Sequence, residues 1–145
     1  MKVSDFIVQR LADWGISRVY GYPGDGINPL LAAINRSKDV ISKDEIENRD
    51  ENGSPPKDEE LFDRASHLEF VQVRHENMAA FMACAHAKFT GEIGVCMATA
   101  GPGAIQLLNG LYDAKMDHQP VLAIVGQQQR AALGTNFIQD VDLAS

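Results

Sequence analysis

Apolar and polar residues follow two different periods along this chain. Short runs rich in Val, Ile and Tyr predict buried strands, and longer stretches with apolar residues three or four positions apart predict helices. The expected strands are 18–20, 69–73, 93–98 and 121–125, and the expected helices are 4–14, 27–35, 76–89 and 104–116. Strands that alternate with helices predict an α/β fold, an open, mostly parallel sheet with helices on both faces.

Two local signals refine the first helix and one segment interrupts the pattern. Ser4 is expected to cap this helix and Gly15 to end it. Residues 38–67 contain ten acidic and five basic residues, so they carry −5 of the net charge of −7. Their composition predicts an acidic insertion that forms a solvated loop, with a short helix around 57–64.

Composition and charge limit which kinds of partner and which cellular location are expected. A chain of 145 residues fits one domain. Its net charge of −7 argues against nucleic acid and anionic membranes as partners. Asp5 and Arg10 interrupt the N-terminal apolar residues, and no run reaches membrane-spanning length, so a cytoplasmic location is expected. Cys84 and Cys96 lie in apolar segments and are expected to be buried free thiols.

The candidate chemistry begins at Glu76, where a predicted strand meets an Ala-rich helix. Residues that follow a strand in an open α/β sheet face the region where ligands bind. A glutamate in the first turn of a helix is also favoured by the helix dipole alone, so Glu76 has a purely structural explanation too. Two Gly-Pro turns, 21–28 and 100–104, each join an apolar run to a helix, and neither has the spacing of a dinucleotide or P-loop motif.

The order of several motifs is more specific than any one of them. They are Tyr20-Gly21-Tyr22-Pro23-Gly24-Asp25, Arg74-His75-Glu76, Ala100-Gly101-Pro102-Gly103, Leu108-Asn109-Gly110-Leu111-Tyr112-Asp113-Ala114 and His118-Gln119-Pro120. In this order they resemble the N-terminal, pyrimidine-binding (Pyr) domain of the thiamine-diphosphate-dependent 2-keto-acid enzymes. The pyruvate oxidase and acetolactate synthase group is the most similar.

The resemblance implies a role for each of these residues. Glu76 stands where the family places a glutamate that hydrogen-bonds N1′ of the aminopyrimidine and so helps the cofactor's amino group to remove a proton. Asp25 and Gln139 would face the substrate, with Phe137 or Ile138 as an apolar wall; Asp25 could instead simply cap the next helix. The residues expected to bind the cofactor, besides Glu76, are Gly24, Gly101, Pro102, Gly103 and Asn109.

The resemblance also implies parts that lie outside residues 1–145. The central and diphosphate-binding domains of the family are absent here, so Mg²⁺ would be held by a domain or partner not in this chain. No metal site is expected in it, although Gly24-Asp25-Gly26 and Asn52 imitate the family's metal motif. FAD in the parent enzyme is left open, and the parent is expected to be a homo-oligomer, a dimer or tetramer.

These observations leave three alternative hypotheses for the function. The first is a Pyr-domain fragment of a 2-keto-acid enzyme, oxidase-like and inactive alone. The second is a natural small subunit of a split decarboxylase. The third is a non-catalytic interaction module that docks through the acidic insertion, and Glu76 argues against it. His75, His86 and His118 are expected to be ordinary helix-start, helix-face and loop histidines.

Overall fold

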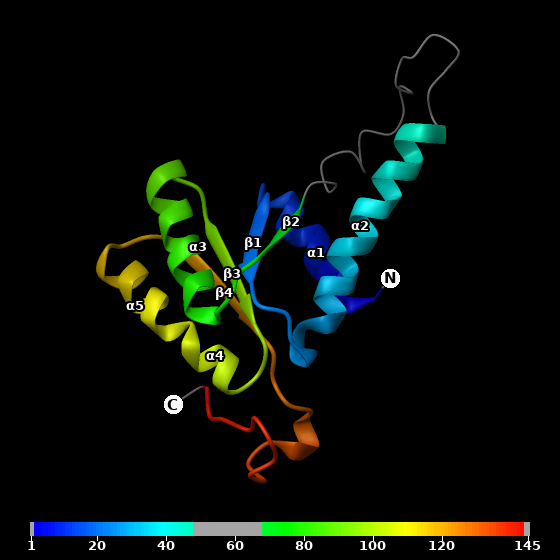
Figure 1. Ribbon diagram of the computed structural model, residues 1–145. Helices are drawn as coiled ribbons and strands as arrows, with labels where there is room; N and C mark the ends of the chain where they lie inside the picture. Colours follow the sequence, from blue (N-terminus) through cyan, green and yellow to red (C-terminus); the bar gives the residue numbers. More distant parts are fainter. Residues whose placement is uncertain (1, 48–67, 144–145) are drawn as a thin grey trace.

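The computed structural model describes residues 2–47 and 68–143, with the backbone alone for 38–47. Its centre is a parallel sheet of four strands in the order β2-β1-β3-β4 (Figure 1). The strands are β1 (Arg18–Gly21), β2 (Glu69–Gln72), β3 (Gly94–Ala98) and β4 (Val121–Val125). Each expected strand is present, and β4 has the bounds that the sequence predicts.

Helices cover both faces of the sheet, as expected for an α/β fold of this kind. α1 (Val3–Asp13) and α2 (Asn28–Glu47) lie on one side, and α3 (Glu76–Thr90), α4 (Pro102–Gln106) and α5 (Leu108–Met116) lie on the other (Figure 1). Two short 3-10 helices, η1 (Asp25–Ile27) and η3 (Arg130–Ala132), lie in the connections after β1 and β4. The fold class predicted from the sequence is therefore confirmed.

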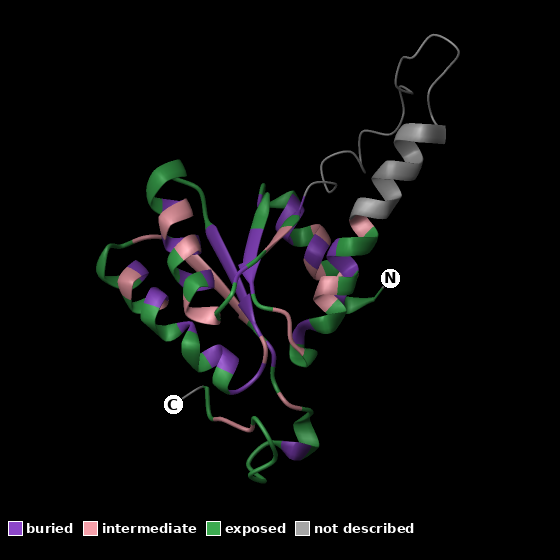
Figure 2. Cartoon of the chain, viewed as in Figure 1, coloured by how far each residue is buried: buried purple, intermediate pink, exposed green. Residues whose placement is uncertain are grey.

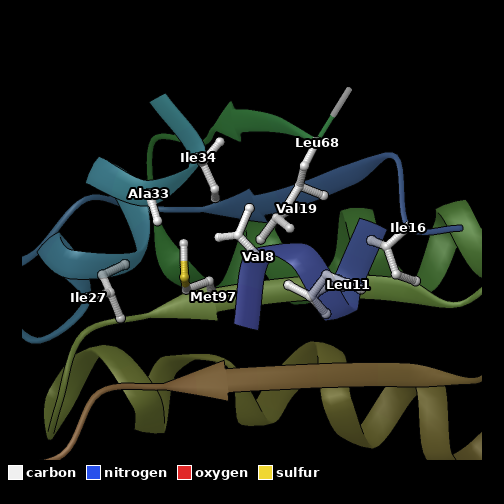
Figure 3. Packing of buried hydrophobic residues seen from close by; sticks show 10 residues of the cluster. Val8, Leu11, Ile16, Val19, Ile27, Ala33, Ile34, Leu68 and Met97 are labelled. Carbon is white, nitrogen blue, oxygen red and sulfur yellow. The ribbon is translucent and has the colours of Figure 1, made fainter. Parts of the chain in front are cut away.

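The pleat of β3 divides the core into two clusters. Val95 and Met97 point to the side of α1 and α2, whereas Cys96 and Ala98 point to the side of α3. Figure 2 shows all of β3 as buried, and Figure 3 shows Met97 beside residues of α1, α2 and β1. Because successive strand residues point to opposite faces, one fully buried strand supports both layers of helices.

Glycines set how closely the elements on the α3 side approach one another. A Cβ at Gly94 of β3 would lie 2.0 Å from the carbonyl oxygen of Ala83 in α3. A Cβ at Gly110 of α5 would lie 2.5 Å from the backbone nitrogen of Phe81, which is also in α3. Real Cβ atoms do not approach so closely, so α3 can pack against β3 and α5 at these distances only because both positions are glycine.

The first helix begins earlier than expected, and Ser4 does not cap it. The N-cap is Lys2, whose backbone N–H donates to the Asp5 carboxylate at 3.1 Å, and Ser4 is buried in the first turn. Gly15 does end the helix, with φ of +80° and its N–H bonded to the carbonyl of Ala12 at 2.8 Å. A side-chain carboxylate in the first turn thus replaces the expected serine cap.

The second helix is longer than predicted, and the last one is divided. α2 continues to Glu47, although the helix was expected to end at residue 35 and a loop to begin at 38; no Gly or Pro interrupts 30–47 to stop it. The helix expected over 104–116 starts earlier, with Pro102 at its first position, and is divided at the fully buried Leu107. The short helix predicted around 57–64 lies outside the described residues.

Within the described ranges, no helix is both long and apolar enough to cross a membrane.

Candidate functional site

The strand order reverses between β1 and β3, which lie side by side in the sheet. The chain leaves β1 toward α2 on one face and leaves β3 toward α4 and α5 on the other (Figure 1). In open α/β sheets, ligands bind outside the carboxyl ends of the strands at such a reversal. The residues of interest are therefore those in the connections that follow β1 and β3.

These two connections meet around the side chain of Thr99. The Gly26 N–H donates to Thr99 Oγ1 at 3.1 Å. A Cβ at Gly24 would lie 2.6 Å from Thr99 Cβ, and one at Gly103 would lie 2.8 Å from Thr99 Cγ2. Because these positions are glycines, the turn after β1 and the turn after β3 can both press against one threonine.

Glu76 stands beside this junction at the start of α3. Its side chain is only 18% exposed, and Oε1 lies 3.3 Å from the point where a Cβ of Gly103 would be. It lies in the first turn of α3, a common position for acidic side chains, and little of it is open to water. The structure thus brings Glu76 together with Gly103, as the sequence predicts.

His75 precedes Glu76 and acts as the N-cap of α3. Its Nδ1 accepts a hydrogen bond from the Asn77 backbone N–H at 3.4 Å and lies 4.0 Å from Glu76 Oε2. His86 lies further along α3, with Nδ1 3.2 Å from the Tyr20 hydroxyl and Nε2 3.2 Å from Glu92 Oε2. The helix-start and helix-face assignments of these two histidines are confirmed.

Gln139 returns to the same edge of the sheet from the end of the chain. A Cβ at Gly101 would lie 2.6 Å from the Gln139 carbonyl oxygen and 2.9 Å from its Cα. Both residues have positive φ, +67° at Gly101 and +64° at Gln139. The left-handed conformation is unusual for glutamine and costs free energy. The Gln139 side chain itself is exposed.

Asp25, Pro102 and Asn109 are exposed. Asp25 is the first residue of η1, whose N-cap is Gly24, and its Oδ1 accepts a hydrogen bond from Asn28 Nδ2 at 3.2 Å. The alternative interpretation of Asp25 as a helix cap is therefore wrong. Pro102 occupies the first position of α4, and Asn109 lies on α5.

Thr99 is the first of three site residues that sequence reasoning missed. It contacts the turn after β1 across a separation of 73 residues, which no local pattern reveals. Gly26 and Gly126 were missed for the same reason, and a Cβ at Gly126 would lie 2.9 Å from the Gly26 carbonyl oxygen. The connections after β1, β3 and β4 therefore all meet here.

The cysteines take no part in this site. Both are free and buried, as predicted. Burial raises the pKa of the Cys96 thiol to about 12, and burial together with the nearby Asp113 carboxylate raises the pKa of the Cys84 thiol. Such thiols stay protonated at neutral pH. In the part of the chain that the structure describes, no group of three or more His, Cys, Asp or Glu side chains could hold a metal ion.

Comparison with known proteins places the chain in a family. Residues 58–145 match the family model described as thiamine pyrophosphate enzyme, N-terminal TPP binding domain. The chain belongs to this family. It is 42% identical over 137 residues to YdaP of Bacillus subtilis, whose name provisionally describes it as thiamine pyrophosphate-containing.

Two further relatives carry the names of enzymes. The chain is 35% identical over 136 residues to the pyruvate oxidase of Lactiplantibacillus plantarum, and 35% identical over 137 residues to the acetolactate synthase of Arthrospira platensis. Each of these three alignments covers 94% of this chain, but 19%, 18% and 19% of the respective relatives. The chain thus spans about a fifth of the length of the curated relatives it matches.

The geometry of this TPP-binding domain fits the aminopyrimidine end of thiamine pyrophosphate, also called thiamine diphosphate. The carboxyl group of Glu76 is mostly shielded, and it faces a backbone turn in which a Cβ at Gly103 would fill the space between Glu76 and Thr99. A carboxyl group can form a hydrogen bond with a ring nitrogen, and glycines let a backbone turn approach a ligand closely. The family match includes Glu76, Gly101-Pro102-Gly103 and Gln139.

Proposed function

We propose that this chain is the pyrimidine-binding domain of a thiamine-diphosphate-dependent 2-keto-acid enzyme, of the pyruvate oxidase-like type, and that Glu76 is its cofactor-activating glutamate. One observation carries the proposal. Glu76 begins α3 at the carboxyl edge of the sheet, 18% exposed, with Oε1 beside Gly103 of the opposing turn. A carboxyl group in this position can share a proton with a ring nitrogen while bulk water is largely excluded.

The relatives support the class of substrate. Their names include pyruvate oxidase and acetolactate synthase, and each aligns over nearly all of this chain. When bound, thiamine diphosphate supplies a thiazolium carbon that adds to the carbonyl group of a 2-keto acid. Glu76 would bind N1′ of the aminopyrimidine and hold a proton there, and the backbone of Gly24 and Gly101–Gly103 would border the ring.

The proposed substrate-side residues are Asp25 and Gln139. Asp25 is exposed in the turn after β1, and Gln139 lies against Gly101 in the turn after β3. Both therefore border the turns that would hold the ring. Asn109 and Pro102 remain proposed cofactor contacts on α5 and α4.

The remainder of the site would come from elsewhere. We propose that the diphosphate and Mg²⁺ are held by a domain of the same or a partner chain, in a homo-oligomeric parent enzyme. Apolar side chains on α4 and α5 support such a partner, because they leave a large apolar face exposed. They are Ile105 (41% exposed), Leu108 (47%), Tyr112 (61%) and Met116 (74%).

A titration of the isotope-labelled chain with thiamine, followed by NMR, tests the role of Glu76. We expect weak, saturable binding that shifts the amide signals of Glu76 and Gly101–Gly103, because these groups surround the proposed ring position. Thiamine diphosphate with Mg²⁺ should bind no more than modestly tighter in calorimetry, since the described residues hold no metal ligand set.

Two glutamate-to-glutamine variants test whether thiamine binding depends on Glu76. Glu76→Gln should weaken thiamine binding by about tenfold or more, because it removes the charge-assisted hydrogen bond. Glu92→Gln is the matched control, since Glu92 is 60% exposed and pairs with His86. Equal affinity of Glu76→Gln and wild type for thiamine would contradict the proposal.

A further inference from the structure

We propose that Thr99 is a positioning residue that clamps the turn after β1 to the turn beside Glu76. The inference rests on the proposed function, because it concerns the same pyrimidine site. Thr99 directly follows β3, at the reversal of strand order. Its hydroxyl group bonds the turn after β1, its methyl group lies against both Gly24 and Gly103, and neither contact follows from the role of Glu76.

The hydroxyl group holds the turn after β1. Oγ1 accepts the Gly26 N–H at 3.1 Å, and Gly26 follows the proposed substrate residue Asp25. Gly26 is confined from the other side by Gly126, whose own N–H donates to the Ala98 carbonyl at 3.0 Å. Since Ala98 is part of β3 and Gly126 follows β4, the turn is fixed to two strands of the sheet.

The methyl group supports the opposite turn. Thr99 Cγ2 lies 2.8 Å from the point where a Cβ of Gly103 would be, and Glu76 Oε1 lies 3.3 Å from the same point. Gly103 is therefore confined between Thr99 and Glu76. A shift of Thr99 would change the space beside the Glu76 carboxyl as well as the position of Asp25.

A clamp of this kind needs both groups of a threonine. Serine keeps the hydroxyl and loses the methyl, whereas valine keeps the shape and replaces the hydroxyl with a second methyl. Valine would leave the Gly26 N–H without its acceptor, and it would place an apolar group against that donor. The two substitutions thus separate the bond to Gly26 from the packing of the methyl group against Gly24 and Gly103.

The test compares Thr99→Val and Thr99→Ser in the 145-residue chain, with two measurements. The first is amide hydrogen exchange at Gly26, and the second is the NMR titration with thiamine. We expect Thr99→Val to accelerate Gly26 exchange about five- to tenfold, as for the loss of one hydrogen bond, and to weaken thiamine binding severalfold. Thr99→Ser should keep Gly26 exchange near the wild-type rate, and the loss of its methyl group should still weaken thiamine binding, though less than Thr99→Val does. Thermal unfolding of each variant verifies that it is folded.

The outcomes separate this clamp from the proposed function. Gly26 exchange that is equal in Thr99→Val and wild type would overturn the clamp, whatever the binding result. Faster exchange with unchanged thiamine affinity would show that the clamp does not position the site, and would also overturn the proposal. If the wild-type chain binds no thiamine but Thr99→Val alone accelerates Gly26 exchange, the clamp stands and the proposed function fails.

Discussion

Gly103 determines how closely the turn after β3 can approach Glu76. An added Cβ would lie 2.8 Å from Thr99 Cγ2 and 3.3 Å from Glu76 Oε1, so at least one of these neighbours would have to move. Glycine is needed here for space and not for a left-handed backbone, because Gly103 is absent from the residues with positive φ. The residue therefore couples the backbone of α4 directly to the carboxyl group.

Gly103→Ala should consequently affect both stability and ligand binding. We expect a loss of about 1–3 kcal/mol in the free energy of unfolding, typical of an overpacked buried site, together with weaker thiamine binding. Gly134→Ala is the control, because Gly134 has φ of +75° but nothing within 4 Å of its added Cβ. That control should lose about 1 kcal/mol from backbone strain and bind thiamine normally. Chemical denaturation and the NMR titration measure the two effects, and a Gly103→Ala chain that binds as wild type would contradict the coupling.

At the scale of elements, the pairing of α3 with α5 depends on the absence of a side chain at Gly110. The Cβ of an alanine there would lie 2.5 Å from the Phe81 nitrogen and 2.6 Å from the Ala80 carbonyl carbon. Both atoms belong to the backbone of α3 and cannot rotate away. The two helices would have to separate, although alanine favours helix formation more than glycine does.

Gly110→Ala should therefore destabilise the fold by about 1–3 kcal/mol, against a gain of about 1 kcal/mol that helix propensity alone would give. Asn109→Ala is the matched control in the same turn of α5. Asn109 is exposed, so its replacement should change stability by no more than about 0.5 kcal/mol. Denaturant titration compares the variants, and a more stable Gly110→Ala chain would show that the helices do not meet as closely as described.

The elements show where sequence reasoning succeeds. Strand β4 and the start of α3 at Glu76 were predicted because apolar runs and the change of period are local signals. The continuation of α2 to Glu47 is not predicted, because the high charge of this segment indicates a loop, although no Gly or Pro in 30–47 breaks the helix. Ser4 has the residue type of an N-cap, but the N-cap is Lys2, two residues earlier, whose N–H donates to the Asp5 carboxylate.

In the candidate site, too, residues at locally visible junctions could be predicted, and contacts between distant segments could not. Glu76 and Gly101–Gly103 could be found from motif order, because each lies at a strand-to-helix junction visible in the sequence. The contacts of Thr99 with Gly24, Gly26 and Gly103 could not, because they join separate connections after β1 and β3. The position of Gln139 against Gly101 likewise depends on the path of the chain after β4.

Burial of Cys96 in the sheet makes the stability of the whole molecule fall at alkaline pH. The pKa of this thiol is about 12 in the fold, above its ordinary value of 9.0. Between these values the unfolded chain loses the proton that the folded chain keeps, so stability falls as pH rises. We expect a slope approaching 1.4 kcal/mol per pH unit from Cys96 within this window, and Cys84 acts in the same direction.

Denaturant unfolding of wild type and Cys96→Ala between neutral pH and about pH 11 measures this slope. The variant loses some stability at neutral pH because it leaves a small cavity, but it should lose less on going to high pH. Parallel slopes in the two proteins would show that Cys96 is not shielded from water as the fold describes.

The hydrogen bond between Glu76 and the cofactor ring is open to direct observation. Thiamine labelled with nitrogen-15 at N1′ reports its own protonation and hydrogen bonding through its chemical shift. Titrated with wild-type chain and with Glu76→Gln, and extrapolated to saturation, N1′ should move toward the shift of the protonated ring only with the wild type. An identical bound shift with both proteins would mean that Glu76 does not contact N1′, and would contradict its assignment as the cofactor-activating residue.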